Sequence, residues 1–253
     1  MSKVFIFIFA ALALGLAMYS PNIYKLYRLA NLYNEKTIAK NFINIDNIFS
    51  NISSPIPASE KPHIFETKDF DLPEKYSFEG EELDLKEGLS HFHTDGLIIL
   101  HDGKMLFEDY WNGNTKDSKH ISFSVAKSYL SALFGIAIDE GLIDSIDDNV
   151  TKYLEDFAGT GYEDVKIKNL LQMSSGIEFN EDYADPNSDI NKFSRASAKG
   201  QSFRDFAKSL KNEREQGTYN HYVSLDTQVL AMILESVTDM PVREYLYLSL
   251  IHI

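Results

Sequence analysis

Residues 121–141 read ISFSVAKSYLSALFGIAIDEG, and the interpretation of the whole chain starts from this stretch. Its length and its apolar content predict a largely buried helix. Gly141 is suited to end that helix, because glycine adopts the left-handed backbone of a helix C-terminus without strain. Ser124 and Lys127 lie three residues apart near the other end, so on a helix they share a face and lie within hydrogen-bond reach.

A serine hydroxyl beside a lysine amine is a pairing suited to nucleophilic catalysis. Burial disfavours the charged form of a lysine, and the neutral amine is then a base for the serine proton. The helix N-terminus adds N–H groups and the positive end of a dipole, which stabilise an oxyanion. The spacing alone does not decide the function, because 24 Ser and 19 Lys yield about two Ser-x-x-Lys matches by chance. The structural alternative is a helix start that Ser122 or Ser124 caps, with Lys127 extending into solvent.

Composition excludes several classes of protein. A chain of 253 residues accommodates one large domain or two lobes. The net charge of −14 argues against a nucleic-acid partner, which requires clustered Lys and Arg. The absence of Cys excludes a thiol nucleophile, disulfides and Cys-based zinc sites. His91 and His93 do not share a helix face, which argues against a metal pair, and we expect no metal and no other cofactor.

The N-terminal segment predicts export. Residues 1–18, MSKVFIFIFAALALGLAM, place one Lys before a continuous apolar run, as in a signal peptide or an N-terminal membrane anchor. Cleavage and anchoring both stay open, and we expect a periplasmic protein or one anchored in the membrane and facing outside the cytoplasm. Residues 19–74 are expected to form a helical stem and a Pro/Ser-rich linker. A folded domain is expected over residues 75–253.

Two β-hairpins are expected before the central helix. Residues 76–83 predict a small one, and residues 96–113 predict a longer one with Asp102 and Gly103 as its two-residue turn. The continuous apolar run 97–100 favours a strand that is buried on both faces.

After the central helix, the pattern predicts further helices and one long loop. Asp226 is expected to cap an apolar helix over residues 227–237. Residues 180–200 are polar and irregular, as in a loop at the surface or at the edge of a cleft. Shorter helices are expected over residues 85–92, 165–173 and 202–210.

Three segments together resemble the serine β-lactamase/penicillin-binding superfamily, with a likeness that runs over residues 75–247. Ser124-Val-Ala-Lys127 matches the Ser-x-x-Lys motif. Residues 169–177, NLLQMSSGI, resemble the Leu-Leu-x-His-Thr-Ser-Gly segment, with Met and Ser in place of His and Thr. Tyr222-Val-Ser224 is similar to the second motif in its Tyr-x-Ser form, found in the branch of class C-like proteins that holds 6-aminohexanoate-dimer hydrolases and family VIII carboxylesterases.

The resemblance implies a fold and a mechanism. The implied fold is α/β (α+β) and β-lactamase-like, with an antiparallel sheet, packed helices and an all-helical lobe. Ser124 would be the acylated nucleophile, Lys127 its base partner, and Tyr222 the group that passes protons to the leaving group and from the deacylating water. Ser224 would be a secondary substrate-binding residue. The alternative for Tyr222 is an aromatic side chain in the core. If the alignment with the motif is shifted, Tyr219 takes the place of the motif tyrosine instead.

The implied function is hydrolysis of a small-molecule ester or amide by a serine hydrolase. The third motif of the family, Lys/His-Thr/Ser-Gly on a strand, does not occur between Ser224 and Ile253. We therefore expect the chain to be truncated at its C-terminus, with strands of the sheet missing. Two alternatives stay open: a non-catalytic, membrane-anchored, penicillin-binding-like binding or sensor protein, and an inactive fragment of the hydrolase. The sequence leaves the oligomeric state undetermined.

Overall fold

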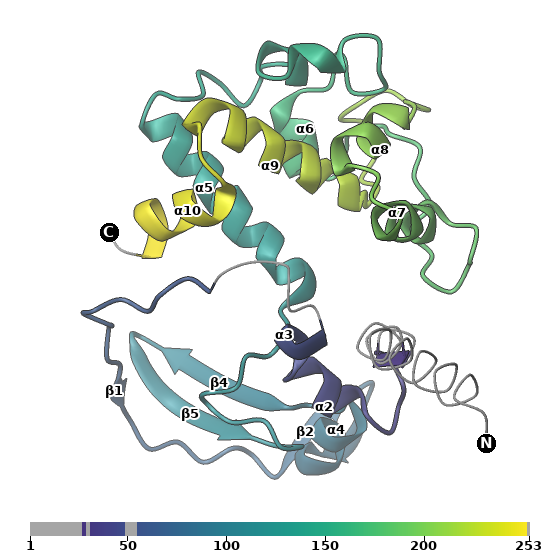
Figure 1. Ribbon diagram of the computed structural model, residues 1–253. Coiled ribbons are helices and arrows are strands. Elements are labelled where there is room, and N and C mark those ends of the chain that lie inside the picture. The colour runs from purple at the N-terminus through teal and green to yellow at the C-terminus, as the bar shows by residue number, and fades with distance from the viewer. Residues whose placement is uncertain (1–26, 29–30, 49–54, 252–253) are drawn as a thin grey trace, which may run out of the picture. The chain divides into compact units, whose positions relative to one another are not determined.

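The computed structural model describes residues 27–28, 31–48 and 55–251 (Figure 1). The chain divides into two compact units: unit 1 comprises Met1–Pro55 and Lys61–Ser122, and unit 2 comprises Ile56–Glu60 and Phe123–Ile253. The expected signal peptide or anchor over residues 1–18 lies outside the described residues. Within the described ranges, no helix has the length and apolar character that crossing a membrane requires.

Unit 1 contains a three-stranded sheet in the order β1-β5-β4. The predicted hairpin is confirmed as β4 (Gly96–His101) and β5 (Lys104–Tyr110), which pair antiparallel (Figure 1). Asp102 and Gly103 both have positive φ, 49° and 73°, as a type I′ turn requires. A pairing that the sequence did not predict adds β1 (Glu66–Thr67), which runs parallel to β5.

Among the described residues, unit 1 also contains a second hairpin and several short helices. The predicted small hairpin is confirmed, and its strands pair antiparallel. The helix that follows it begins at an Asp84 cap, whose carboxylate accepts the N–H of Glu87 over 2.8 Å. These elements are β2 (Lys75–Phe78), β3 (Glu81–Asp84), α4 (Leu85–His91), α2 (Ile38–Phe42) and α3 (Ile45–Ile48).

The prediction that the apolar run 97–100 is buried on both faces is wrong. β4 lies at an edge of the sheet as described, and Ile98 and Leu100 are 51% and 49% exposed. An apolar run indicates which side chains favour burial, but the elements that pack on a strand decide which of its faces are covered.

Unit 2 is helical, in agreement with the expected all-helical lobe. Its core forms around α9 (Ser224–Thr238), which packs against α5 (Ala126–Asp139), α6 (Ile167–Leu171) and α8 (Phe203–Ser209), and also against α10 (Val242–Leu246) (Figure 1). The other elements of unit 2 are η1 (Phe123–Val125), η2 (Val150–Lys152), η3 (Glu155–Phe157), α7 (Asp189–Ala198) and the π-helical turn η4 (Tyr247–Ile251).

The central helix α5 is amphipathic, so the prediction of a largely buried helix holds for one face only. Its start is exposed: Val125 and Tyr129 are 59% and 52% accessible to solvent. The neighbouring helices cover only the face that meets the core of unit 2. The buried residues of α5 are Leu130, Leu133, Phe134 and Ala137.

The C-terminal end of α5 agrees with the prediction for Gly141. Gly141 has φ 74°, and its N–H donates to Ile138 O over 3.0 Å. The N–H of Leu142 donates to Ala137 O over 2.9 Å, which completes a Schellman motif. At the other end Val125 is the N-cap residue without a side-chain cap, so the alternative in which Ser122 or Ser124 caps this helix is not observed.

Two expectations for the C-terminal half are corrected. Residues 180–200 are not irregular throughout, because α7 begins at Asp189 after a Ser188 cap whose hydroxyl accepts the N–H of Asn191 over 3.4 Å. Asp226 does not cap α9, because the helix begins at Ser224 and places Asp226 inside its first turn, fully buried. The polar composition of this segment favoured a loop, although Ile190, Phe193 and Ala196 share one face of α7 and pack against the core of unit 2.

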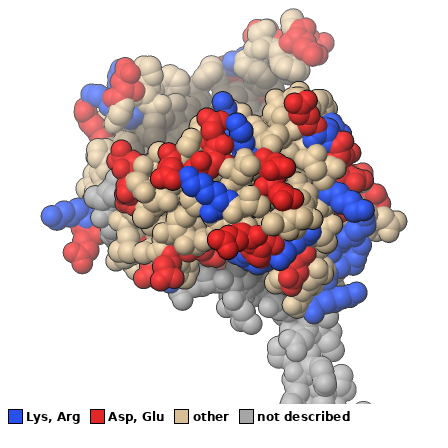
Figure 2. All heavy atoms as spheres, turned by 90° about the horizontal axis from the view of Figure 1, so that it is seen from above, with Lys and Arg blue, Asp and Glu red and all other residues tan. Residues whose placement is uncertain are grey.

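Figure 2 shows acidic and basic side chains intermixed on the face that it draws. Asp156 accepts bonds from Arg204 at 2.6 Å and from Lys208 at 3.1 Å, and Lys152 pairs with Asp148 at 2.9 Å. In such pairs each carboxylate lies next to a Lys or Arg side chain, so negative and positive charges alternate. This face therefore differs from the continuous basic stripe with which proteins bind a nucleic-acid backbone.

Candidate active site

Three of the predicted site residues meet around one hydroxyl oxygen. Ser124 lies in η1, directly before α5, and Lys127 lies in the first turn of α5. Lys127 Nζ donates to Ser124 Oγ over 3.0 Å. Tyr222, two residues before α9, donates its hydroxyl to the same Oγ over 2.8 Å. The fold of unit 2 thus brings together side chains that lie 98 positions apart.

The environment of these side chains is open to solvent. Ser124 is exposed and Lys127 is half-buried, so the enclosure expected for the lysine amine is incomplete. Lys127 Nζ also lies 5.2 Å from the centroid of the Tyr222 ring. Two donors on one hydroxyl oxygen favour negative charge there, which is what a serine nucleophile needs.

Tyr219 and Tyr222, the two candidates for the motif tyrosine, have different environments. Tyr222 is 40% exposed, so the alternative of a core aromatic is wrong. Tyr219 is 57% exposed, and its ring lies 4.9 Å from the guanidinium carbon of Arg214. Of the two, Tyr222 is the one whose hydroxyl bonds to Ser124.

Ser224 is hydrogen-bonded to Glu181. Its hydroxyl donates to Glu181 Oε1 over 2.6 Å, and its N–H donates to Glu181 Oε2 over 3.1 Å. The carboxylate of Glu181 therefore caps α9 from 43 positions away, which explains why α9 begins without a local cap. A role of Ser224 in substrate binding stays a prediction. The sequence held no signal for Glu181, because nothing in a polar loop marks one carboxylate as a remote cap.

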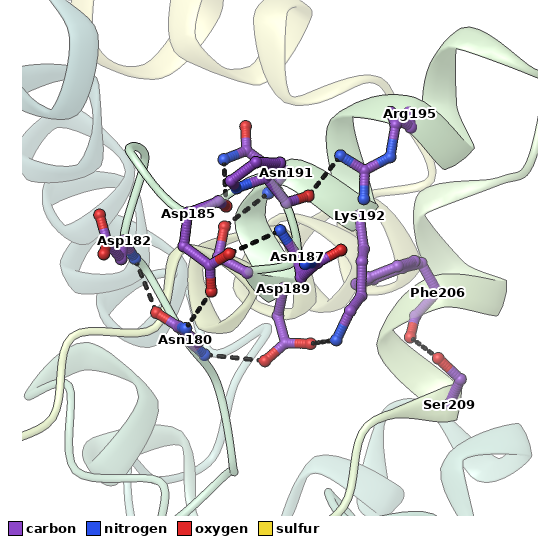
Figure 3. A network of polar contacts seen from close by, with 12 residues as sticks. Asn180, Asp182, Asp185, Asn187, Asp189, Asn191, Lys192, Arg195, Phe206 and Ser209 are labelled. Carbon is purple, nitrogen blue, oxygen red and sulfur yellow. Dashed lines mark hydrogen bonds and ion pairs between the residues drawn. The ribbon is translucent and has the colours of Figure 1, made fainter.

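The loop that carries Glu181 is held by its own hydrogen bonds (Figure 3). The N–H of Asn180 donates to Asp189 Oδ2 over 2.8 Å, and the N–H of Asp182 donates to Asn180 Oδ1 over 2.9 Å. Lys192 Nζ binds the other oxygen of Asp189 at 2.8 Å. Asn180, before Glu181, is thus bonded to the start of α7, and Asp182, after it, is bonded to Asn180, which restrains the carboxylate that caps α9.

The segment before α9 is pinned to the loop after α6. Gly217 N–H donates to Ser174 O over 2.8 Å, and His221 N–H donates to Met173 O over 2.7 Å. The residues of the NLLQMSSGI segment thus support the backbone that precedes Tyr222. His221 Nε2 lies 2.7 Å from Phe179 O.

A buried carboxyl lies beneath this segment, and the sequence did not predict it. Asp226 has no solvent exposure, and Tyr162 Oη donates to its Oδ1 over 3.0 Å. Burial raises the pKa of Asp226 to about 7; hydrogen bonding by Ser175 and Tyr162 lowers that pKa in part, and the charge of Glu181 raises it. Burial also raises the pKa of Tyr162 well above its usual value.

The described residues contain no cluster of three or more His, Asp or Glu side chains arranged to hold a metal ion. Three groups meet at Ser124: its own hydroxyl, the amine of Lys127 and the phenol of Tyr222. A hydroxyl with an adjacent amine and phenol is an arrangement that supports nucleophilic acyl transfer.

Comparison with known proteins identifies the family. The model of the family Beta-lactamase matches residues 85–251. The chain belongs to this family, and the resemblance to the serine β-lactamase-related superfamily is confirmed.

Relatives and solved structures agree with this assignment. The chain is 34% identical over 165 residues to the 6-aminohexanoate-dimer hydrolase of Paenarthrobacter ureafaciens. The match covers 62% of this chain and 41% of that protein. It is 24% identical over 220 residues to the "Putative D-alanyl-D-alanine carboxypeptidase" of Escherichia coli K12. This match covers 77% of this chain and 49% of that protein. The chain thus spans less than half the length of these curated relatives.

The fold is confirmed by a solved structure. The "Putative 6-aminohexanoate-dimer hydrolase from Bacillus anthracis" superposes with a TM-score of 0.78 at 18% sequence identity, covering 88% of this chain and 60% of that chain. The predicted mixed α/β, β-lactamase-like fold is therefore correct for the described residues.

Proposed function

We propose that the protein is a serine hydrolase that cleaves a small ester or amide through an acyl-enzyme at Ser124. The observation that carries the proposal is the position of Ser124 Oγ, which accepts hydrogen bonds from Lys127 Nζ at 3.0 Å and from Tyr222 Oη at 2.8 Å. Membership of a hydrolase family supports it. The name of the relative from Paenarthrobacter ureafaciens supports a small amide as the substrate class.

In the proposed acylation, Ser124 Oγ attacks the carbonyl carbon of the substrate while its proton passes to the unprotonated amine of Lys127. The oxyanion of the tetrahedral intermediate accepts a bond from the backbone N–H of Ser124. Tyr222 Oη donates a proton to the leaving alcohol or amine as the carbonyl re-forms. The acylated serine and the free leaving group are the products of this step.

In the proposed deacylation, water attacks the acyl-enzyme and gives its proton to the Tyr222 phenolate. Ser124 Oγ then leaves and regains its proton from Lys127, which restores the starting state. Positioned acid–base groups of this kind contribute about 10²- to 10⁴-fold to the rate. The apolar segment 1–18 supports a location outside the cytoplasm, either in the periplasm or at the membrane.

Covalent labelling of the full chain with a fluorophosphonate tests the proposal. We expect an adduct on Ser124, located by peptide mass mapping, and turnover of p-nitrophenyl esters. Ser124→Ala should abolish both, whereas Ser128→Ala, at an exposed position of the same helix, should retain both. An unlabelled Ser124, together with ester turnover that Ser124→Ala leaves unchanged, would overturn the proposal. Ligand affinity without labelling or turnover would favour the non-catalytic binding protein.

A further inference from the structure

We propose that Asp226 is a positioning residue, which fixes the first turn of α9 and so places Tyr222 Oη on Ser124 Oγ. This inference rests on the proposed function, because it concerns the tyrosine of that site. Asp226 lies four residues after Tyr222 and is fully buried. It faces the core of unit 2 rather than the exposed oxygen of Ser124, so it acts through the backbone.

The carboxyl of Asp226 connects the first turn of α9 to the turns that precede α6. Tyr162 Oη, from these turns, donates to Asp226 Oδ1 over 3.0 Å. Ser175, in the loop that follows α6, lowers the pKa of this carboxyl. Tyr162, Ser175 and Asp226 all have 0% exposure. The first turn of α9 is therefore attached to the turns before α6 by groups that water does not reach.

The connection to Tyr222 is short and runs through buried backbone. The N–H of Asp226 donates to Val223 O over 3.1 Å, and Val223 itself is fully buried. On the other side of Tyr222, the N–H of His221 donates to Met173 O over 2.7 Å. Met173 belongs to the loop that follows α6, so this loop holds the chain directly before Tyr222, and the bond from Tyr162 to Asp226 holds the helix turn after it.

A carboxyl at this position is costly for the fold. Asp226 Oδ2 has no hydrogen-bond partner among the described residues, and burial of an incompletely paired carboxylate is unfavourable. An apolar side chain could fill such a place without that penalty. What the carboxyl adds is directional bonding, since it accepts the hydroxyl of the distant Tyr162 at a defined geometry.

The charge state of Asp226 makes the role measurable. The titratable groups that act on it are Tyr162, which donates a hydrogen bond, and Glu181, whose charge opposes ionisation. Its pKa of about 7, raised chiefly by burial, lies within the range in which hydrolases are assayed. The ionised carboxylate accepts the Tyr162 hydroxyl more strongly than the neutral acid does. We therefore expect the kcat of the wild-type protein to decrease as the pH falls through about 7.

The test compares Asp226→Asn with Asp239→Asn, the same substitution at an exposed position at the other end of α9. We expect Asp226→Asn to lower kcat and the rate of Ser124 labelling by roughly 10- to 100-fold, the range that a displaced catalytic group produces, with little change in KM. The pH limb near 7 should disappear from its kcat profile. Asp239→Asn should retain the wild-type rate and profile.

A double mutant separates a positioning role from a general loss of stability. In a Tyr222→Phe background, Asp226→Asn should have no further effect on kcat, because the group that it positions is gone. Additive losses, or a wild-type pH profile in Asp226→Asn, would overturn the inference. If Asp226→Asn fails to fold, Tyr162→Phe tests the same link in both backgrounds. Failure of the wild-type chain to label at Ser124 would overturn the proposed function instead.

Discussion

Tyr222 Oη donates a hydrogen bond of 2.8 Å to Ser124 Oγ, across 98 positions of the sequence. The two residues precede different helices, α9 and α5, which pack against each other within unit 2. The bond therefore depends on the packing of unit 2 and on the buried contacts that hold the start of α9. Both side chains are exposed enough to be changed without opening the core.

Tyr222→Phe should reduce ester turnover by about 10²- to 10⁴-fold, because it removes the group that transfers protons to and from the substrate. The fold should survive, since the substitution deletes one oxygen from a side chain that is 40% exposed. Tyr219→Phe is the matched control and should keep the wild-type rate. Steady-state kinetics with circular dichroism measure both properties, and equal rates for the two variants would contradict the role assigned to Tyr222.

Lys127→Arg should lower kcat/KM by about 10²-fold or more, although it preserves a positive charge. The reason is that a guanidinium remains protonated and cannot take the proton of Ser124. Lys168→Arg, at an exposed position on α6, provides the control. Labelling rates with a fluorophosphonate measure the step directly. Near-normal labelling of Lys127→Arg would mean that Lys127 acts through its charge and not as a base.

Gly176→Ala should destabilise unit 2 more than Gly141→Ala does. Both glycines have left-handed backbone, with φ of 79° and 74°, which costs a residue with a Cβ about 1–2 kcal/mol. At Gly176 the added Cβ would also overlap the carbonyl oxygen of Arg214, whereas at Gly141 it would meet nothing within 4 Å. Urea unfolding monitored by circular dichroism gives the two free energies. Equal losses would show that the Gly176 loop relaxes freely.

The pH dependence of stability should report Asp226. Its pKa is raised from the usual 3.8 to about 7, so the folded chain binds the proton more tightly than the unfolded chain does. The contribution of Asp226 to stability is thus fully present below about pH 4 and is lost as the pH rises through about 7. The loss amounts to on the order of 4 kcal/mol, at about 1.4 kcal/mol per pKa unit.

Asp226→Asn removes this titration, so the variant should gain stability relative to wild type as the pH rises from about 4 to about 8. Thermal or urea unfolding of both proteins across that range measures the difference. Stability curves that stay parallel would mean that Asp226 has an ordinary pKa in the folded chain.

Local features of the fold were predictable because a few neighbouring residues determine them. Asp102 and Gly103 supply the positive φ angles of the hairpin turn, so the sequence placed β4 and β5 correctly. Gly141 ends α5 for the same reason. Burial was predictable only in part: an apolar run does not reveal which elements cover it, and Ile98 in β4 is half exposed.

The candidate site likewise has features that the sequence predicted and features that depend on tertiary packing. The sequence by itself placed Ser124 and Lys127 together, because helical geometry brings residues three apart onto one face. Tyr222 was chosen over Tyr219 by resemblance to a motif, and tertiary structure decided which hydroxyl reaches Ser124. Only the folded chain brings Glu181 to Ser224 and Tyr162 to Asp226, since such contacts between distant segments depend on how the helices of unit 2 pack. A residue that looked like a local helix cap is therefore a buried carboxyl beneath the tyrosine of the site.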